Sequence, residues 1–391
     1  MEKTAAVEGG NVGETESFPA GNFDSGRECG FSSLTRRKSR IETAVASNGL
    51  MGLGNLGNMG FMNSMLQCLS STRLLADFFV SDEYETNLNR KSHMKGRLVR
   101  AFADLLKRMR NKKESSPLLP TEVGGQIRGF LPGYSKQDAH EFLRFLLDGL
   151  HEDLRIDSPK SASNFATRFT SESDLASEKY RACENSKIAD LFVGQLMSTL
   201  TFESCSHQSI TYDTFWDLSL PIPRRKQSFF SSYDRLSTSV DSTLTDCFDF
   251  FTEPETMDGD NSPFCSKCNR KRRCTKRLTL SKLPPILVIH LKRFGVSTKI
   301  SDVIKFPVER NVNLEPYLDS NSPSKGGQCL YKLYAVSNHM ESTFSGHYTA
   351  SCKHSVTDEW YLFDDSSVRL VDSSSVRGLQ CYVLFYEKCK S

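Results

Sequence analysis

Apolar residues recur at helical spacing in the first part of the chain. Between Asn63 and Val80 they lie three or four positions apart, which predicts an amphipathic helix whose amino terminus falls at or close to Gly60 and Phe61. A nucleophile at that position would lie at the positive end of the helix dipole, which stabilises an anionic side chain.

A second amphipathic helix is predicted from about Lys136 to Leu154, where leucine and phenylalanine form one apolar face. Ser135, followed three residues later by Asp138, resembles a capping box, in which side chains accept hydrogen bonds from the first backbone N–H groups of a helix. We therefore expect the part of the chain up to Leu154 to be mainly helical.

The pattern changes beyond a polar segment at 155–187. Short segments rich in β-branched and aromatic residues, separated by turn residues, predict the strands of an antiparallel sheet. These segments are 209–217, 278–280, 286–291, 331–336, 347–352, 360–363 and 382–386. A Ser-rich segment at 227–242 and a charged segment at 253–261 interrupt the sheet.

Residues 1–48 are rich in Gly, Ser, Glu and Thr and contain few large apolar side chains. Such a segment cannot bury enough surface to offset the entropy of ordering it, so we expect a disordered amino-terminal tail. The basic residues Arg36, Arg37, Lys38 and Arg40 fit either a nuclear-import signal or ordinary solvated charge.

Composition and charge narrow the class of protein. The 391 residues are 38% hydrophobic and 25% charged, as is typical of a globular protein, and the formal charge of +3 argues against nucleic acid or a membrane as the main partner. The sequence has neither a signal peptide nor a run of about 18 apolar residues, so we expect a cytoplasmic or nuclear location, or both. The 12 cysteines are too sparse for a disulfide framework and are expected to be reduced.

His347 and Asp364 indicate catalytic chemistry. His347 lies at the start of one predicted strand and Asp364 lies just past the end of another. Two neighbouring strands could place the carboxylate against the imidazole, which is how a general base is oriented. The alternative is a buried histidine beside a surface acidic turn, but the flanking sequences, Ser-Gly-His-Tyr and Phe-Asp-Asp-Ser, favour the catalytic interpretation.

Four blocks of sequence resemble the motifs of one enzyme family. They are GLGNLGNMGFMNS from residue 52, KQDAHEFL from 136, LPPILVIHLKRF from 283, and SGHYTASC from 345 with WYLFDDSSV from 360. In this order they are similar to the nucleophile box, the Gln-Asp box, the palm strand and the His and Asp boxes of the ubiquitin-specific proteases, which are papain-like cysteine deubiquitinases.

The resemblance implies an α+β, papain-like fold over residues 49–388. Within it, a helical thumb would span about 50–187, β fingers about 188–282, and an antiparallel β palm about 283–388. The active site would lie between thumb and palm.

The resemblance also implies roles for individual residues. Asn55 would donate a hydrogen bond to the oxyanion, and His347 would act as general base and acid. Asp364, with Asp365 as a helper, would orient His347. The nucleophile position of the family, a cysteine, corresponds here to Gly60.

A second group of residues is implied to contact ubiquitin. Asp138 and Glu141 would face the arginine-bearing tail of ubiquitin, and Tyr348 would line the narrow channel for its terminal Gly-Gly. His140 stands where the family usually has Gln, which is a departure at a backbone contact.

With glycine at position 60, the chain lacks the thiol on which the chemistry of the family depends. A thiolate must form an acyl-thioester before water can hydrolyse it, and the reaction requires no cofactor. Ser64 and Cys68 lie one and two helical turns farther on, roughly 6–12 Å along the helix axis, and are out of reach. We expect Cys68 to pack in the interior as a small apolar residue.

Cys205, Cys265 and Cys268 are candidate metal ligands. The resemblance implies that two cysteine pairs bind a structural zinc at the tip of the fingers, where tetrahedral zinc takes four ligands. Phe202 occupies the place of the fourth cysteine, so we predict an incomplete site.

Two alternatives for the tip of the fingers remain open. Either Cys274 or His207 completes a zinc site, or the tip holds no metal. The basic run at 270–277 fits a solvated finger tip, with contact to acidic partners or nucleic acid as the alternative.

We therefore predict a monomeric family member that binds ubiquitin or ubiquitylated proteins but is catalytically impaired. One alternative is an active cysteine-type deubiquitinase in which Gly60 is an artefact or a variant of a functional gene. The other is a non-enzymatic scaffold or nucleic-acid-binding protein that uses the basic segments.

Overall fold

The computed structural model describes residues 50–390, apart from 56, 112, 113, 115, 129–137, 157–170, 224–241, 296–298, 323, 328, 342–345, 378 and 379. The predicted tail at 1–48 and its basic residues lie outside the described residues, as do Ser135 and most of the Ser-rich segment. Across the described ranges, no helix combines the length and the apolar character that crossing a bilayer requires.

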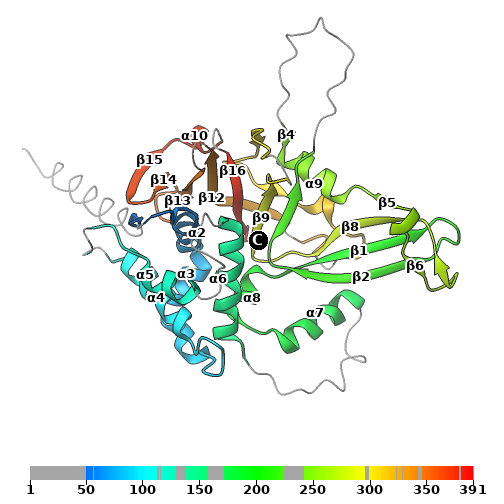
Figure 1. Ribbon diagram of the computed structural model, residues 1–391, viewed down its shortest axis with the longest axis horizontal. Coiled ribbons are helices and arrows are strands. Elements are labelled where there is room, and N and C mark those ends of the chain that lie inside the picture. Colours follow the sequence, from blue (N-terminus) through cyan, green and yellow to red (C-terminus); the bar gives the residue numbers. More distant parts are fainter. Residues whose placement is uncertain are drawn as a thin grey trace, which may run out of the picture. The chain divides into compact units, whose positions relative to one another are not determined.

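The first part of the described chain is helical, as predicted, up to the first long strand (Figure 1). Its α-helices are α2 (Gly60–Ser70), α3 (Arg73–Val80), α4 (Arg97–Met109), α5 (Thr121–Arg128), α6 (Ala139–Leu154), α7 (Glu172–Cys183) and α8 (Lys187–Phe192).

The apolar stretch from Asn63 to Val80 forms two helices rather than one. Thr72 separates α2 from α3 in an extended conformation, and its buried hydroxyl lies 3.1 Å from the carbonyl oxygen of Cys68 and 2.8 Å from the hydroxyl of Tyr334. The partner Tyr334 lies far away in the sequence, so the pattern of local residues could not predict this break.

Helix α6 begins at Ala139 rather than at about Lys136. Asp138 is its N-cap, because its carboxylate accepts hydrogen bonds from the backbone N–H groups of His140 at 2.8 Å and Glu141 at 3.0 Å. Asp138 therefore caps the helix itself and is not the second member of a capping box that begins at Ser135.

The polar segment at 155–187 contains a helix that the sequence pattern did not predict. This helix, α7, is capped by Ser171, whose hydroxyl accepts a hydrogen bond from the N–H group of Asp174 at 3.1 Å. Only Ser173 among its residues is buried, so α7 has no apolar face that periodicity could reveal.

The larger sheet has eight strands in the order β15-β14-β13-β12-β16-β9-β3, with β11 paired to β12. The strands are β3 (Leu218–Pro221), β9 (Ile286–Lys292), β11 (Val312–Asn313), β12 (Leu330–Glu341), β13 (Gly346–Lys353), β14 (Trp360–Asp364), β15 (Ser367–Val371) and β16 (Cys381–Lys388). The strands predicted after residue 285 are all present. The short strand β3 pairs parallel to β9, so the palm is not wholly antiparallel, and β3 falls within the range 188–282 that was assigned to the fingers.

A second sheet of four strands has the order β2-β1-β8-β5. Its strands are β1 (Gly194–Phe202), β2 (Gln208–Phe215), β5 (Glu255–Met257) and β8 (Cys274–Lys282), of which β1, β2 and β8 run as long neighbouring arrows in Figure 1. The small pair β6 (Phe264–Cys265) and β7 (Arg270–Lys271) lies near the far end of these strands. A parallel pair, β4 (Ser242–Thr243) with β10 (Ile304–Lys305), and two helices, α9 (Leu244–Thr252) and α10 (Ser373–Arg377), complete the fold.

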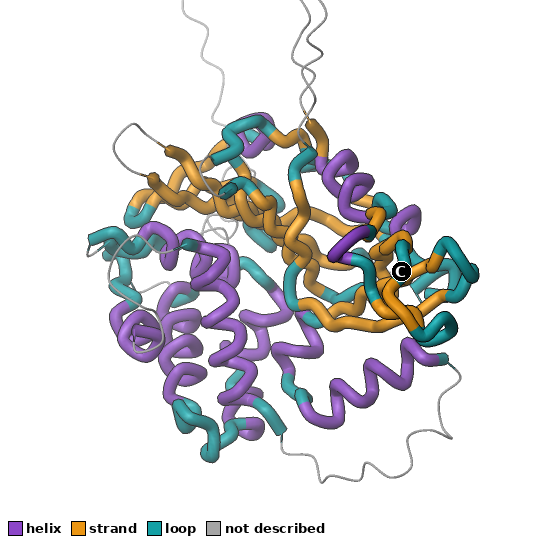
Figure 2. Tube along the Cα trace, turned by 45° about the vertical axis from the view of Figure 1, so that its right-hand side comes forward, coloured by secondary structure: helices purple, strands orange, loops and turns teal. Residues whose placement is uncertain are grey.

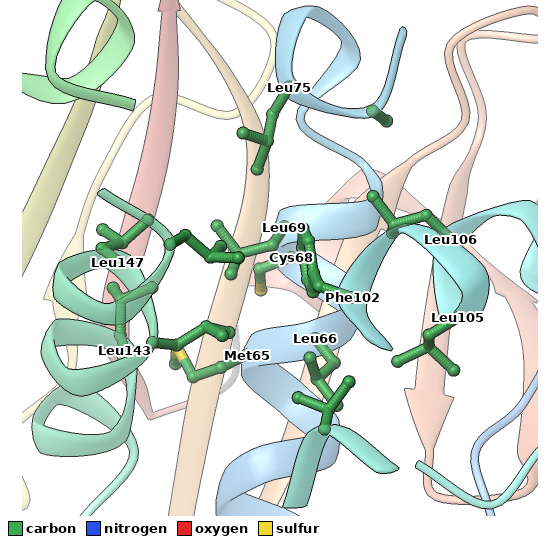
Figure 3. Packing of buried hydrophobic residues seen from close by; sticks show 14 of the residues in the cluster. Met65, Leu66, Cys68, Leu69, Leu75, Phe102, Leu105, Leu106, Leu143 and Leu147 are labelled. Carbon is green, nitrogen blue, oxygen red and sulfur yellow. The ribbon is translucent and has the colours of Figure 1, made fainter. Parts of the chain in front are cut away.

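The core is packed around α2. Met65 and Leu69 of α2 are fully buried with Phe102 of α4 and Leu143 of α6 (Figure 3). Figure 2 shows most of the helices gathered on one side of the larger sheet, and α2 contacts β13. Each such side chain contributes about 1.5–3 kcal/mol through burial, so the packing fixes the position of α2 and of Gly60 at its start.

Candidate active site

Gly60, His347 and Asp364 lie in line at the contact between α2 and β13. A Cβ atom on residue 60 would lie 3.8 Å from Nδ1 of His347 and 3.5 Å from the backbone oxygen of Tyr348. The other ring nitrogen of His347, Nε2, lies 2.7 Å from Oδ1 of Asp364. Each nitrogen of the imidazole is therefore directed at one of the two predicted partners.

This geometry suits a general base. When Nε2 donates its proton to Asp364, Nδ1 is the free acceptor, and it is Nδ1 that faces residue 60. The side chains of His347 and Asp364 are 42% and 47% exposed, so the pair is accessible from outside the protein.

The loop before α2 is ordered by Asn55. Its Oδ1 atom accepts hydrogen bonds from the N–H groups of Gly57 at 2.8 Å and Met59 at 3.2 Å. Gly57 has a φ angle of +117°, a conformation that favours glycine. Asn55 thereby holds the backbone that leads into residue 60.

Asp365 contacts Asn55 rather than the imidazole. One carboxylate oxygen accepts a hydrogen bond from Nδ2 of Asn55 at 2.9 Å, and the other accepts from Nδ2 of Asn63 at 2.7 Å. An asparagine amide has two N–H donors, so Asn55 keeps one for an oxyanion. The geometry makes Asp365 a positioning residue for Asn55, which differs from its predicted role as a helper of Asp364.

The carboxylate of Asp138 accepts hydrogen bonds from several groups of the protein itself. Besides capping α6, it accepts hydrogen bonds from the hydroxyls of Tyr382 at 2.6 Å and Tyr348 at 3.5 Å. Burial raises the pKa of both tyrosines, and the Asp138 charge adds to this effect. Asp138 thus joins α6 to the palm strands β13 and β16.

Glu141 and Tyr348 differ in their exposure. Glu141 is exposed on α6 and lines a pocket of about 370 Å³ together with Asp148 and Trp216. Tyr348 is partly buried, and its ring lies 4.4 Å from that of His339. Of the residues predicted to contact ubiquitin, Glu141 is the acidic one that faces outward.

His140 belongs to a polar cluster that the sequence analysis did not find. Its Nε2 atom lies 2.8 Å from Oδ1 of Asp217, and its ring stacks on that of His290 at 3.8 Å. The hydroxyl of Ser219 lies 2.8 Å from Nδ1 of His290, and Arg144 forms an ion pair with Asp217 at 3.3 Å. The only signal in the sequence was the unusual His140.

This cluster joins the start of α6 to strands β3 and β9. Burial, followed by the charge of His140, lowers the pKa of His290 to about 3, so His290 is neutral. Burial raises the pKa of Asp217, but His140 and Arg144 outweigh this and lower it. Donor atoms of His140, Asp217 and His290 lie within 4.8 Å of one another, but Nε2 of His140 is already hydrogen-bonded to Asp217 and Nδ1 of His290 to Ser219.

Neither Ser64 nor Cys68 can replace the missing nucleophile. Ser64 is 3% exposed, and its hydroxyl lies 3.0 Å from the carbonyl oxygen of Phe61 and 3.1 Å from the hydroxyl of Ser337. Cys68 is fully buried, as predicted, and burial together with Cys352 raises the pKa of its thiol.

Cys205, Cys265 and Cys268 come together at the tip of the smaller sheet. Their sulfur atoms all lie within 4.8 Å of one another, and those of Cys205 and Cys265 are 3.7 Å apart. A hydrogen bond from the backbone of His207 lowers the pKa of the Cys205 thiol. The structure therefore assembles the three predicted ligands.

The two candidates for a fourth ligand lie outside this group of three. Cys274 is buried opposite Phe202 in the β1–β8 pair, and Nε2 of His207 lies 3.1 Å from the hydroxyl of Ser266. A structural zinc ion takes four protein ligands, so these residues do not fit the zinc site that the resemblance implied.

Comparison with known proteins agrees with the geometry. The family model described as ubiquitin carboxyl-terminal hydrolase matches residues 51–386. The chain is 41% identical to ubiquitin carboxyl-terminal hydrolase 2 of Homo sapiens over 353 residues, which are 88% of this chain and 56% of that protein. It is 35% identical to ubiquitin carboxyl-terminal hydrolase 21 of Homo sapiens over 376 residues, which are 90% of this chain and 63% of that protein. The chain thus spans little more than half of these relatives.

Solved structures with the same fold include a SAGA DUB module of Ubp8, Sgf11, Sus1 and Sgf73 bound to monoubiquitin. The match has a TM-score of 0.67 at 26% identity and covers 92% of this chain and 75% of that chain. The same module bound to ubiquitin aldehyde matches with a TM-score of 0.65 at 26% identity, over 92% of this chain and 75% of that chain. By its α+β papain-like fold and by the family model that matches almost all of its described residues, the chain belongs to the ubiquitin carboxyl-terminal hydrolases, as a member of the ubiquitin-specific protease family.

Proposed function

We propose that this chain binds ubiquitin, free or attached to other proteins, and does not hydrolyse its conjugates at a rate typical of the family. The observation that carries the proposal is that Gly60 has no side chain beside an assembled His347–Asp364 pair. The similar solved structures contain ubiquitin or ubiquitin aldehyde, which supports ubiquitin as the ligand.

The activity of the family is the thiol-dependent hydrolysis of ubiquitin isopeptide bonds. The thiolate attacks the carbonyl carbon, the histidine moves the proton to the leaving amine, and water then releases the acyl group. Loss of the nucleophile alone costs about 10⁶ in turnover in a triad that acts as a unit. This factor corresponds to roughly 8 kcal/mol of lost transition-state stabilisation.

Binding of ubiquitin does not require the missing thiol. Glu141 and Asp148 are exposed on α6, at the rim of the 370 Å³ pocket, and they present negative charge to a basic peptide. We infer that the arginine-bearing tail of ubiquitin meets Glu141 rather than Asp138, because the carboxylate of Asp138 is already used by the helix cap and by Tyr382.

The proposal is tested by titrating ubiquitin into the protein in a calorimeter and by assaying release of ubiquitin from conjugates. We expect binding without release, and no covalent adduct with a ubiquitin that carries a thiol-reactive group at its carboxyl terminus. Glu141→Lys is expected to weaken binding about tenfold or more, because like charges would then face each other. Release of ubiquitin at a rate typical of the family, or no binding, would show that the proposal is wrong.

A second candidate function is that of an active deubiquitinase whose functional gene encodes cysteine at position 60. The space around residue 60 favours this second candidate, because a Cβ atom there would lie 3.5 Å or more from its nearest neighbours and a cysteine side chain could therefore begin without a clash. Sequencing codon 60 from independent transcripts decides between the two, because a cysteine codon in all of them would identify Gly60 as an artefact.

A further inference from the structure

Three cysteines from separate segments meet at the tip of the smaller sheet. Cys205 lies in the turn between β1 and β2, Cys265 in β6, and Cys268 in the turn between β6 and β7, near the far end of the long strands in Figure 1. The sulfur atoms of Cys205 and Cys265 are 3.7 Å apart. Two sulfur atoms bound to the same ion at about 2.3 Å are roughly 3.8–4.0 Å apart, so this spacing suits a shared ion.

A backbone N–H group stabilises the sulfur atom of Cys265. The N–H group of Cys268 donates to Sγ of Cys265 at 3.4 Å, which closes the Cys-x-x-Cys turn around the sulfur. Such N–H donors compensate the negative charge of thiolates, as they do for anions at other backbone turns. Together with the mutual approach of the three sulfur atoms within 4.8 Å, this turn brings the side chains close before any ion binds.

Phe202 packs beside this cluster. It is 1% exposed and packs in one apolar cluster with Cys265 and Cys274, against which Cys205 and Cys268 lie. Its ring stacks on His207 at 6.1 Å and 12°, and the Nε2 atom of His207 faces Ser266. A phenyl ring supplies no ligand.

We propose that Cys205, Cys265 and Cys268 form a three-coordinate thiolate site for Cu(I) rather than a structural zinc site. Thiolates are soft ligands that select Cu(I) or zinc, and zinc requires a fourth ligand in a structural site. Cu(I) is a closed-shell ion that accepts three ligands in a plane. Binding replaces three S–H protons, so three thiols and one Cu(I) give a complex of charge 2− and release three protons.

Positive charge around the cluster suits an anionic complex. Lys267, Arg270 and Lys271 are exposed within the same tip, on or next to β6 and β7, while Arg273 forms an ion pair with Glu203 at 3.2 Å. This places the basic run that the sequence analysis left without a function beside the thiolates. Electrostatic attraction between these cationic side chains and the 2− complex lowers the free energy of the complex at the protein surface.

The test uses the reduced full chain without oxygen. Cu(I) is titrated in the presence of a colorimetric Cu(I) chelator, and Zn(II) in the presence of a zinc chelator. We expect one equivalent of Cu(I) to be retained, and Zn(II) to be lost to its chelator. Cys205→Ser should lower the Cu(I) affinity by at least about 100-fold, because even outer-shell changes cost 10–100-fold, whereas the exposed Cys183→Ser should change nothing.

Phe202→Cys provides the converse test, since it completes a set of four cysteines and should produce retention of one Zn(II). Thermal unfolding of this variant with and without zinc shows whether it folds. If it does not fold, the comparison of Cu(I) with Zn(II) binding to the unaltered chain still tests the proposal. The proposal is wrong if the unaltered chain retains Zn(II) as tightly as Cu(I), if it retains neither, or if Cys205→Ser retains Cu(I) unchanged.

Discussion

Replacing Gly60 with cysteine is the change that tests the site most directly. A Cβ atom at this position would lie 3.8 Å from Nδ1 of His347 and no closer than 3.5 Å to its nearest neighbour, which is ordinary van der Waals contact. The sulfur lies one bond beyond Cβ and can therefore reach hydrogen-bond distance of the ring. His347 is already held by Asp364 at 2.7 Å, so no other part of the triad has to move.

The expected gain follows from the role of the nucleophile. Gly60→Cys should raise kcat/KM for a ubiquitin derivative with a fluorogenic leaving group by about 10⁶, which is roughly 8 kcal/mol of transition-state stabilisation. The affinity for ubiquitin should stay within about threefold, because the thiol is a small part of the binding surface. Fluorescence release measures the first quantity, and calorimetry measures the second.

Two matched variants separate chemistry from structure. Gly60→Ala adds the Cβ atom without the thiol, so it should leave the protein inactive and change its free energy of unfolding by at most about 1 kcal/mol, in the stabilising direction, since alanine is favoured over glycine in a helix. Gly60→Cys combined with His347→Ala should lose most of the restored activity, because the thiol then lacks its base.

The result that would refute this reasoning is a folded Gly60→Cys protein that binds ubiquitin and remains inactive. The arrangement of Asn55, His347 and Asp364 would then be insufficient for catalysis. Equal activity in Gly60→Cys and Gly60→Ala would show instead that the measured release does not depend on the thiol.

Three further changes test the contacts around the site. Asp365→Ala should lower the free energy of unfolding by about 1–3 kcal/mol, because it removes the nearer acceptor of the buried Asn63 amide and leaves only the Gly54 carbonyl oxygen at 3.3 Å; urea denaturation measures this, and an unchanged midpoint would contradict it. Asp138→Ala removes a helix cap, at a cost of about 0.5–2 kcal/mol, and also the acceptor of the Tyr382 hydroxyl, at roughly 1–3 kcal/mol more, with Asp138→Asn, which keeps a capping oxygen, costing less in the same assay. His290 has a folded-state pKa of about 3, below its value of about 6.5 in the unfolded chain, so the unfolded state binds more protons as the pH falls and stability is lost on acidification. We expect a loss of roughly 2 kcal/mol between pH 7 and pH 5 from His290, a contribution that His290→Gln should remove; an equal pH dependence in both proteins would disprove it.

Much of the fold could be predicted from spacing along the chain. The strands after residue 285 and the start of α2 at Gly60 follow from alternation and from helical periodicity, which depend on neighbouring residues alone. Helix α7 could not be predicted, since only Ser173 of its residues is buried. The break at Thr72 could not be predicted either, because Thr72 is hydrogen-bonded there to Tyr334, which lies on an element far away in the sequence.

The candidate site likewise has features that the sequence predicts and features that depend on the tertiary structure. The sequence alone determined that the nucleophile position is glycine and that a histidine and an aspartate follow on two strands, since these are statements about residue identity and order. Only the tertiary structure decided that Asp365 binds Asn55, that the carboxylate of Asp138 accepts a hydrogen bond from Tyr382, and that Phe202 packs in one cluster with Cys265. These outcomes depend on which side chains meet across elements far apart in the chain, and a pattern of local residues carries no information about such meetings.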